Sequence, residues 1–227
     1  MNPTLKASEV REIGIDIARP FVERWHYSGC LPTGKNIFLG WYVKSDLLQS
    51  DLFGDSLYAV ADYGIGVNPY QASFLSAQTG CNIQNGDLLE LKRLCRVEPK
   101  IKELPLTAFL SKCHKILKSQ GFSYIVSFSD PTHNHNGGIY KAANFTHLGT
   151  TNPEIHVMDE NGNIRHRRYY FRYARRNNVP VEQARQELNL KRVKTLPKDR
   201  WFLVLDKHAL PSNTACSGLS GTAPESR

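Results

Sequence analysis

The sequence predicts a mixed α/β fold in which helices flank one mixed sheet, organised as a single domain. Two apolar stretches, 37–43 and 57–63, are separated by a polar connection, which predicts an antiparallel pair of strands. A strand at 87–97, an amphipathic helix at 106–117 and a strand at 123–129 then follow one another. This order is typical of a crossover between two parallel strands. With 227 residues, of which 41% are hydrophobic, the chain is long enough for one well-buried domain.

The N-terminal half holds two further predicted features. Apolar residues recur at helical spacing from Val10 to Trp25, which predicts a helix over 9–25 that Pro20 must kink or divide. The segment 64–86 is rich in Gly, Asn, Gln and Ser, and we expect a loop there. A long loop in a compact domain is often functional.

The C-terminal third of the chain is predicted to contain short helices and strands in alternation. We expect, in chain order, a helix at 137–144, a strand at 146–150, a hairpin of 154–158 with 164–173, a helix at 181–190 and a strand at 201–205. From Pro211 onward the composition is Ser, Gly, Thr, Ala and Pro. Such a segment buries too little apolar surface to fold, so we expect a domain over 1–210 and a disordered tail over 211–227.

Composition and cysteine usage limit the class of protein. The sequence contains no run of about 18 apolar residues, and its polar start lacks the basic and apolar regions of a signal peptide. The five cysteines are odd in number and scattered without a Cys-x-x-Cys pair, which argues against a disulfide framework and a thiolate zinc site. We therefore expect a soluble intracellular protein with no membrane partner, and we make no prediction of its oligomeric state.

Positive charge is concentrated in residues 163–178, which we call the basic aromatic segment. The chain has 29 Lys and Arg against 21 Asp and Glu, and six arginines lie close together here: Arg165, Arg167, Arg168, Arg172, Arg175 and Arg176. Aromatic residues are interleaved with them: Tyr169, Tyr170, Phe171 and Tyr173. This pattern suits phosphate contacts combined with stacking on bases, so we expect the six arginines to bind nucleic acid. The alternative is a solvated basic face beside a strand whose aromatic residues are core.

A polar stretch from Ser129 to Tyr140 follows directly on the apolar run 124–128. Open α/β sheets bind ligands outside the carboxyl ends of their strands, so a strand that ends in such a stretch usually opens into a site. We expect its reactive side chains to converge there: Asp130, His133, His135 and Tyr140. The alternative is an Asp-Pro turn with solvated histidines.

The strand at 87–97 has a charged residue in an apolar row. With the alternation of a regular strand, Arg93 shares one face with Leu89, Leu91, Cys95 and Val97. An unpaired buried guanidinium is too costly, so Arg93 must pair or bind something. Two interpretations explain a charged residue at this position: a structural ion pair with Asp130, or a role in binding a ligand. The two are compatible with each other.

Several of these residues carry a resemblance to known families. The stretch from Ile139 to Gly149 resembles the end of the GNAT acyltransferase core, where a tyrosine-bearing helix precedes an aromatic residue and a strand. More closely, residues 20 to 150 resemble the phage Mom family of DNA adenine-modification proteins. This second resemblance is carried by four motifs: His26-Tyr27, Glu90 to Leu94, Ser129-Asp130 and His135 to Asn144.

The resemblance to the Mom family implies a function. It implies a GNAT-like enzyme that alters the exocyclic amine of adenine in DNA by a carbamoylmethylation-type transfer, which protects phage DNA from host restriction. It further implies double-stranded DNA and a small-molecule donor as partners, and the cytoplasm of the infected host cell as location. The alternative is a GNAT-like N-acyltransferase acting on a small amine or a protein. A third class is a non-catalytic nucleic-acid-binding protein.

The chemistry of adenine assigns roles to the candidate residues. The base must leave the stack to be modified, and its amine is a poor nucleophile that needs one group to take its proton and another to support the leaving group. We assign Asp130 as the base or the group that orients it, His135 as the proton carrier and Tyr140 as the general acid. Four residues complete the predicted catalytic set: the anion-positioning Arg93 and Ser129, the stacking Tyr27, and His26.

One departure from the acetyltransferase pattern concerns the donor. The stretch from Glu98 to Pro105 lacks the glycine-containing loop that presents backbone amides to the pyrophosphate of coenzyme A. This argues against a coenzyme A thioester, and the donor is unknown. A two-histidine, one-carboxylate set of the kind that binds non-haem iron is also present, namely Asp130, His133, His135 and His26. Catalytic histidines bonded to a carboxylate explain the same residues more simply, so we predict no metal.

Overall fold

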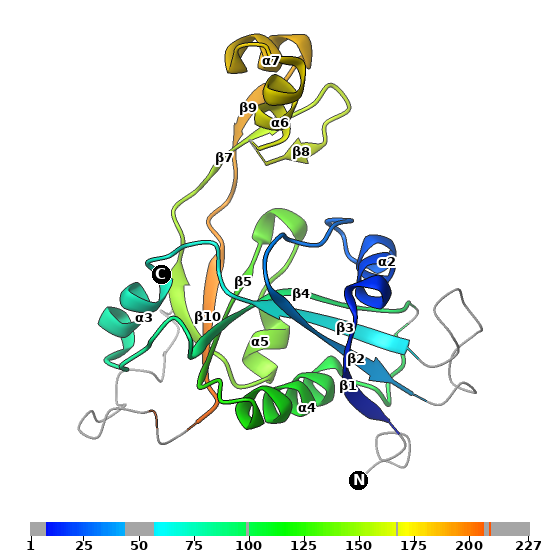
Figure 1. The fold of residues 1–227 in the computed structure, drawn as a ribbon, viewed down its shortest axis with the longest axis vertical. Coiled ribbons are helices and arrows are strands. Elements are labelled where there is room, and N and C mark those ends of the chain that lie inside the picture. The colour runs from blue at the N-terminus through cyan, green and yellow to red at the C-terminus, as the bar shows by residue number, and fades with distance from the viewer. Residues whose placement is uncertain (1–7, 44–56, 99, 167, 207–208, 210–227) are drawn as a thin grey trace, which may run out of the picture. The chain divides into compact units, whose positions relative to one another are not determined.

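The computed structural model describes residues 8–43, 57–98, 100–166, 168–206 and 209 (Figure 1). The chain divides into two compact units. The first comprises residues 1–128, 137–148 and 201–227, and the second comprises residues 129–136 and 149–200. The single domain over 1–210 stays a prediction, and the tail expected over 211–227 lies outside the described residues.

A seven-stranded sheet organises the fold, with the strand order β1-β2-β3-β4-β5-β10-β6. The strands are β1 Glu9–Ile13, β2 Asn36–Tyr42, β3 Leu57–Gly64, β4 Leu88–Arg96, β5 Tyr124–Ser129, β6 Thr146–Thr150 and β10 Asp199–Val204. Strands β1 to β4 are antiparallel neighbours, whereas β4 and β5 are parallel. The predicted mixed sheet, its antiparallel pair and its parallel crossover are therefore confirmed.

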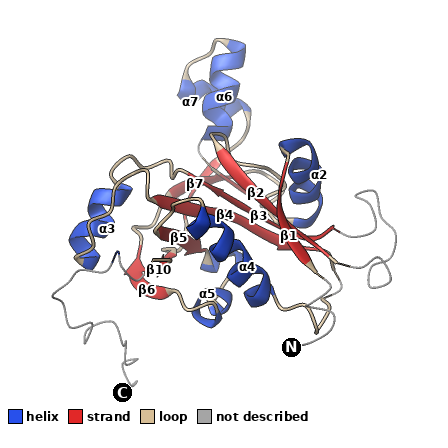
Figure 2. Cartoon of the chain, turned by 60° about the horizontal axis from the view of Figure 1, so that its bottom comes forward, coloured by secondary structure: helices blue, strands red, loops and turns tan. Residues whose placement is uncertain are grey.

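Helices of the first unit pack on both faces of this sheet (Figure 2). They are α2 Ile15–Trp25, α3 Gln71–Thr79, α4 Leu106–Ser119 and α5 Gly138–Ala142. Side chains alternate along β2, so that Trp41 stacks on Phe109 of α4 with ring centroids 5.4 Å apart, whereas Phe38 packs in the cluster that holds Phe21 of α2. Every residue of β3 is buried, as expected for a central strand covered on both faces. No helix of the described residues is long and apolar enough to cross a membrane.

Two predicted elements were wrong in extent. The predicted helix over 9–25 is a strand followed by a helix, β1 and α2, with Gly14 between them. Pairing of β1 with β2 overrides the local helical spacing, since Val10 lies opposite Trp41 in the ladder. The segment 64–86 is not a continuous loop, because it contains α3.

A β-bulge interrupts the pairing of β3 with β4. Asp62 lies opposite Arg93, whereas the next residue of β3, Tyr63, lies opposite Leu91. Lys92 is therefore an extra residue on β4, and the alternation of the strand shifts by one position there.

The bulge corrects the predicted surroundings of Arg93. Leu89 and Leu91 pack in the cluster that holds α4, whereas Cys95 packs in the cluster that holds α2. Arg93 is two residues from Cys95 with no bulge between them, so it lies on the α2 side of the sheet. The single apolar row predicted from Leu89 to Val97 was wrong because a bulge cannot be seen in strand periodicity.

The second unit contains a three-stranded antiparallel sheet in the order β8-β7-β9. Its elements are β7 Ile155–Met158, β8 Ile164–Arg165, α6 Arg168–Asn177, α7 Val181–Glu187 and β9 Lys191–Lys194. The predicted hairpin is confirmed, but its second strand ends at Arg165, and the expected strand up to Tyr173 is the helix α6 instead. In a strand, burial of Tyr170 would also have directed Arg168 and Arg172 inward, whereas a helix buries Tyr170 together with Ala174, four residues on.

The turn into α5 depends on Gly137. Its φ is +71°, and a Cβ at this position would overlap the indole of Trp201. We expect Gly137→Ala to lower the free energy of unfolding by about 2–5 kcal/mol, from left-handed backbone strain plus overpacking, as measured by urea denaturation. Gly121 is the matched control, because its φ is +94° but a Cβ there would meet nothing within 4 Å. If Gly137→Ala and Gly121→Ala lowered the free energy of unfolding equally, the overlap with Trp201 would contribute nothing to the loss.

Candidate active site

The parallel strands β4 and β5 separate part-way along their length. Their pairing runs from Leu88 opposite Tyr124 to Leu91 opposite Ser127. Strand β4 nevertheless continues to Arg96 and β5 to Ser129. We call this divergence the strand fork. Backbone groups that no longer pair across a sheet need other partners, so a fork is a place where a ligand can bind to backbone donors and acceptors.

A hydrogen-bonded tyrosine lies at the strand fork. Ser127 Oγ donates to the carbonyl oxygen of Leu91 at 2.9 Å and is also 2.9 Å from the hydroxyl of Tyr140. A serine has one hydroxyl proton, so Tyr140 is the donor to Ser127 while Ser127 donates to Leu91. The buried Ser127 therefore fixes the position of the Tyr140 hydroxyl.

The surroundings of Tyr140 keep it protonated. Its ring stacks on Trp201 with centroids 5.8 Å apart and meets Phe145 edge-on at 5.4 Å. Burial raises the pKa of Tyr140, against the smaller opposing effect of the Ser127 hydrogen bond. A held, neutral phenol is suited to donate a proton to a leaving group.

Asp62 is a candidate that the sequence reasoning missed. It is 0% exposed on β3, and neither of its carboxylate oxygens has a hydrogen-bond partner among the described residues. Burial raises its pKa to about 7, although Lys92 and Arg93 act to lower it. Buried polar groups are normally satisfied, so an orphaned carboxyl that titrates near neutrality marks a functional candidate. The sequence signal that could have identified Asp62 is an aspartate inside an otherwise apolar strand.

The two cations of the bulge are anchored to the segment after α2 and to the start of β2. Arg93 donates from Nε to the carbonyl oxygen of Cys30 at 3.1 Å and from Nη1 to that of Lys92 at 2.7 Å. Lys92 Nζ donates to Asn36 Oδ1 at 2.9 Å. Asp130, the predicted ion-pair partner of Arg93, belongs to the second unit, so that pairing stays a prediction.

The segment after α2 begins with His26 and Tyr27. His26 Nδ1 lies 2.8 Å from Ser28 Oγ, and the rings of His26 and Tyr27 have centroids 4.4 Å apart. Tyr27 is 55% exposed, and it lies close enough to Tyr140 to contribute to the raised pKa of that residue. An exposed ring near the strand fork is suited to stack on an unpaired base.

The polar residues after β5 belong to the second unit. Asp130 caps the short helix η2 Pro131–His133, because its Oδ1 accepts from the backbone amide of Thr132 at 3.0 Å. Burial, and to a smaller extent His133, lower the pKa of His135, whereas Asp130 acts to raise it. The net lowering favours the neutral imidazole. A neutral imidazole can accept a proton.

The predicted catalytic set is divided between the units. His26, Tyr27, Arg93 and Tyr140 lie in the first unit, and Ser129, Asp130 and His135 lie in the second. Within the second unit, Ser129 Oγ donates to Asp199 Oδ2 at 3.3 Å. Convergence of all seven residues on one site stays a prediction.

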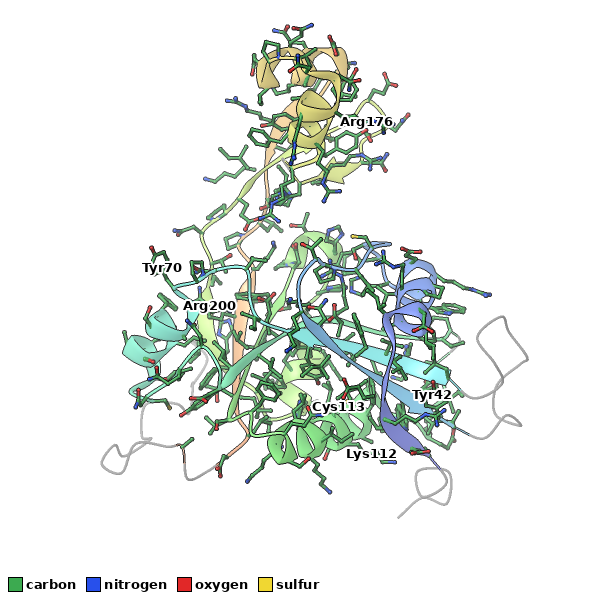
Figure 3. The ribbon with its side chains drawn as sticks, viewed as in Figure 1. Tyr42, Tyr70, Lys112, Cys113, Arg176 and Arg200 are labelled. Carbon is green, nitrogen blue, oxygen red and sulfur yellow. The ribbon has the colours of Figure 1, made fainter. Side chains whose placement is uncertain are left out.

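Helix α6 gathers arginines on one face. Arg168, Arg172 and Arg175 are spaced by four and three residues, so they form a stripe, and Arg176 lies beside it. Figure 3 labels Arg176 in this helix. All four are exposed. Tyr169 and Phe171, also exposed, flank the stripe at 42% and 43%. We call these six residues the basic stripe.

Two predicted arginines are not part of the basic stripe. Arg165 forms an ion pair with Asp159 at 3.0 Å, and its guanidinium lies over the ring of Tyr169 at 4.8 Å. Arg167 lies outside the described residues.

Comparisons with known proteins give one family and several structures. The family model described as the Mom protein family matches residues 7–216. No curated protein matches. A putative acetyltransferase from Acinetobacter baylyi ADP1 aligns with 91% of this chain and 97% of its own, at 12% identity and a TM-score of 0.47. A putative acetyltransferase from Salmonella typhimurium, solved with its cofactor acetyl-CoA, aligns with 92% of this chain and 99% of its own, at 12% identity and a TM-score of 0.46.

Proposed function

We propose, because this chain belongs to the Mom protein family, that it is a transferase that modifies the exocyclic amine of adenine in DNA. The modification is of the carbamoylmethylation type and protects phage DNA from host restriction. The observation that carries the proposal is the family match over residues 7–216, which spans both units of the structure.

The strand fork supplies groups suited to this chemistry. Transfer forms a bond from the adenine nitrogen to the incoming carbon, releases one amine proton, and sends the leaving group away with its bonding pair. Tyr140 holds the proton that the leaving group needs, and Ser127 orients it. As the acceptor of the amine proton we propose His135 of the second unit, because its pKa is lowered.

The connection from β4 to α4 bears on the donor. It contains no glycine between Val97 and Pro105, and Leu104 within it is fully buried. The backbone amide of Ile101 donates to the hydroxyl of Tyr58 at 3.2 Å, which ties the connection to the core. These residues do not fit a loop whose amides surround a pyrophosphate, so we derive no step through coenzyme A and leave the donor open.

The basic stripe supports DNA as the partner. Four exposed arginines on one helix face suit successive phosphates, and the flanking aromatic rings suit stacking on an extruded base. A transferase for a small amine would have no need of this surface.

The test of the function is mass spectrometry of nucleosides from plasmid DNA of cells that express the chain. A heavier deoxyadenosine, absent from cells that carry the empty vector, is the expected result, and its mass identifies the transferred group. Unmodified DNA from cells with abundant folded protein would overturn the proposal, in favour of an acyltransferase for a small amine or of plain nucleic-acid binding.

The basic stripe allows a separate prediction about binding. We expect combined Arg168→Ala and Arg172→Ala to weaken DNA binding and to reduce the slope of log affinity against log salt by about 2, because two phosphate contacts are lost. Fluorescence anisotropy with a labelled duplex at several salt concentrations measures both. Arg185→Ala is the control, since Arg185 pairs with Glu182 on α7 and should leave the slope unchanged. An unaltered slope in the double variant would refute the assignment.

A further inference from the structure

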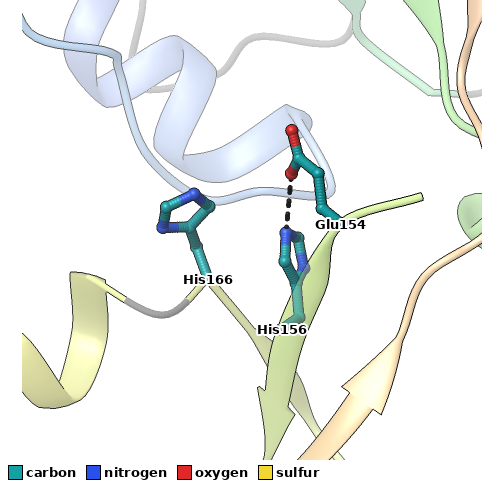
Figure 4. Close-up of side chains that lie close together, drawn as sticks. All are labelled: Glu154, His156 and His166. Atoms are coloured by element: carbon teal, nitrogen blue, oxygen red, sulfur yellow. Dashed lines mark hydrogen bonds and ion pairs between the residues drawn. The ribbon is translucent and has the colours of Figure 1, made fainter. Parts of the chain in front are cut away.

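Three side chains that can ligate metal lie together in the second unit, apart from all the residues assigned above. They are Glu154, His156 and His166 (Figure 4), and one ligand atom of each lies within 4.8 Å of the others. His156 Nε2 is 3.0 Å from Glu154 Oε2, and the two imidazole rings meet edge-on with centroids 5.2 Å apart. Among the described residues, this is the group whose ligand atoms lie close enough together to hold one metal ion.

The register of the small sheet brings these residues together. Val157 of β7 pairs with Arg165 of β8, so the next positions along the hairpin, His156 and His166, lie opposite each other. Glu154 is two residues before His156 and therefore lies on the same face of the strand. The group thus results from regular backbone pairing.

We propose that Glu154, His156 and His166 bind one zinc ion, with a fourth position left for water. Two imidazole nitrogens and one carboxylate oxygen are a ligand set that zinc takes in open tetrahedral sites. At metal–ligand distances of about 2.0–2.2 Å, ligand atoms around a tetrahedral ion lie roughly 3.3–3.6 Å apart. Glu154 and His156 are already close to this spacing, and the exposed side chain of His166 can rotate to complete it.

Zinc must displace three present interactions. The hydrogen bond between His156 Nε2 and Glu154 Oε2 is replaced by bonds from both side chains to the metal. Lys198 Nζ is 3.5 Å from Glu154 Oε2 and competes with zinc for the carboxylate. The backbone amide of Arg168 donates to His166 Nδ1 at 3.1 Å. Ligation through Nδ1 takes that lone pair, and ligation through Nε2 places the ring proton on Nδ1. Either way the bond from Arg168 is lost, so zinc binding alters the first turn of α6, which carries the basic stripe.

Titration of the untagged, metal-free full chain with zinc chloride in a calorimeter tests the site. We expect one zinc ion per chain. His156→Ala and His166→Ala should each weaken zinc affinity by more than the roughly 10–100-fold that loss of an outer-shell partner costs. Cobalt-loaded protein should show the visible absorption of a tetrahedral site, and this absorption should disappear in the same variants. Circular dichroism confirms that each variant is folded.

A double variant, His133→Ala with His135→Ala, is the control for unspecific histidine binding. These two exposed histidines belong to the same unit but not to the proposed site, so zinc affinity should be unchanged. Two results would overturn the proposal: no binding by the unmutated chain, or binding that is kept in His156→Ala and lost in the control.

Discussion

Replacing Tyr140 by phenylalanine is expected to lower the yield of modified deoxyadenosine by about 10²–10⁴-fold, which is the usual contribution of a positioned proton donor. The change removes only the hydroxyl that Ser127 holds at 2.9 Å. The ring, with its stacking on Trp201 and its contact with Phe145, is kept. The quantity to measure is the fraction of deoxyadenosine modified in plasmid DNA, by mass spectrometry.

Tyr124→Phe is the matched control for this loss. Tyr124 also donates one hydrogen bond, to the carbonyl oxygen of Ala209 at 2.8 Å, but it lies on β5 at the end where β4 and β5 are still paired. We expect DNA modification by this variant to stay near that of the unmutated chain. If Tyr140→Phe modified DNA as well as Tyr124→Phe did, Tyr140 would not be the general acid.

The part of the fold that local patterns specify was predictable. The crossover from β4 through α4 to β5 follows from strand and helix periodicities that agree with the final packing. The bulge at Lys92 and the helical state of 168–177 did not follow, because both depend on tertiary packing. A bulge leaves composition unchanged, and interleaved arginine and aromatic residues fit a strand as well as a helix until Tyr170 and Ala174 are seen to be buried together.

The candidate site divides in the same way. Tyr140 was predictable because a sequence motif surrounds it. Asp62 was not, since complete burial without a hydrogen-bond partner is a property of the folded sheet. His156 and His166 were missed for a related reason: they are ten residues apart, and only the register of the β7–β8 hairpin places them opposite each other.

Asp62→Asn is expected to stabilise the protein at alkaline pH by up to about 4 kcal/mol and to change little at acidic pH. The pKa of Asp62 is about 7 in the folded protein against 3.8 for the free side chain. Between these values the folded state binds more protons than the unfolded state, so stability falls as pH rises. The difference of about 3 units corresponds to about 4 kcal/mol, and asparagine, which cannot ionise, avoids this loss.

Urea denaturation at about pH 4 and pH 8 measures the effect, with Asp159→Asn as the control. Hydrogen bonds from the backbone of Asn163 lower the pKa of Asp159, so its contribution has the opposite sign: it is present above the unfolded pKa and is lost as pH falls. Asp159→Asn should therefore give no stabilisation at pH 8. Equal stability of Asp62→Asn and the unmutated chain at pH 8 would contradict a burial-raised pKa.

The same variant distinguishes a functional carboxyl from an incidental one. Proteins keep destabilising buried groups where activity needs them, at the cost of stability. If Asp62 takes part in proton transfer beside Arg93, Asp62→Asn should gain stability at pH 8 and lose DNA modification together, with DNA binding unchanged. If the variant gains stability and still modifies DNA at the full rate, Asp62 is not part of the active site. The chemistry at the strand fork then depends on Tyr140 as its titratable group.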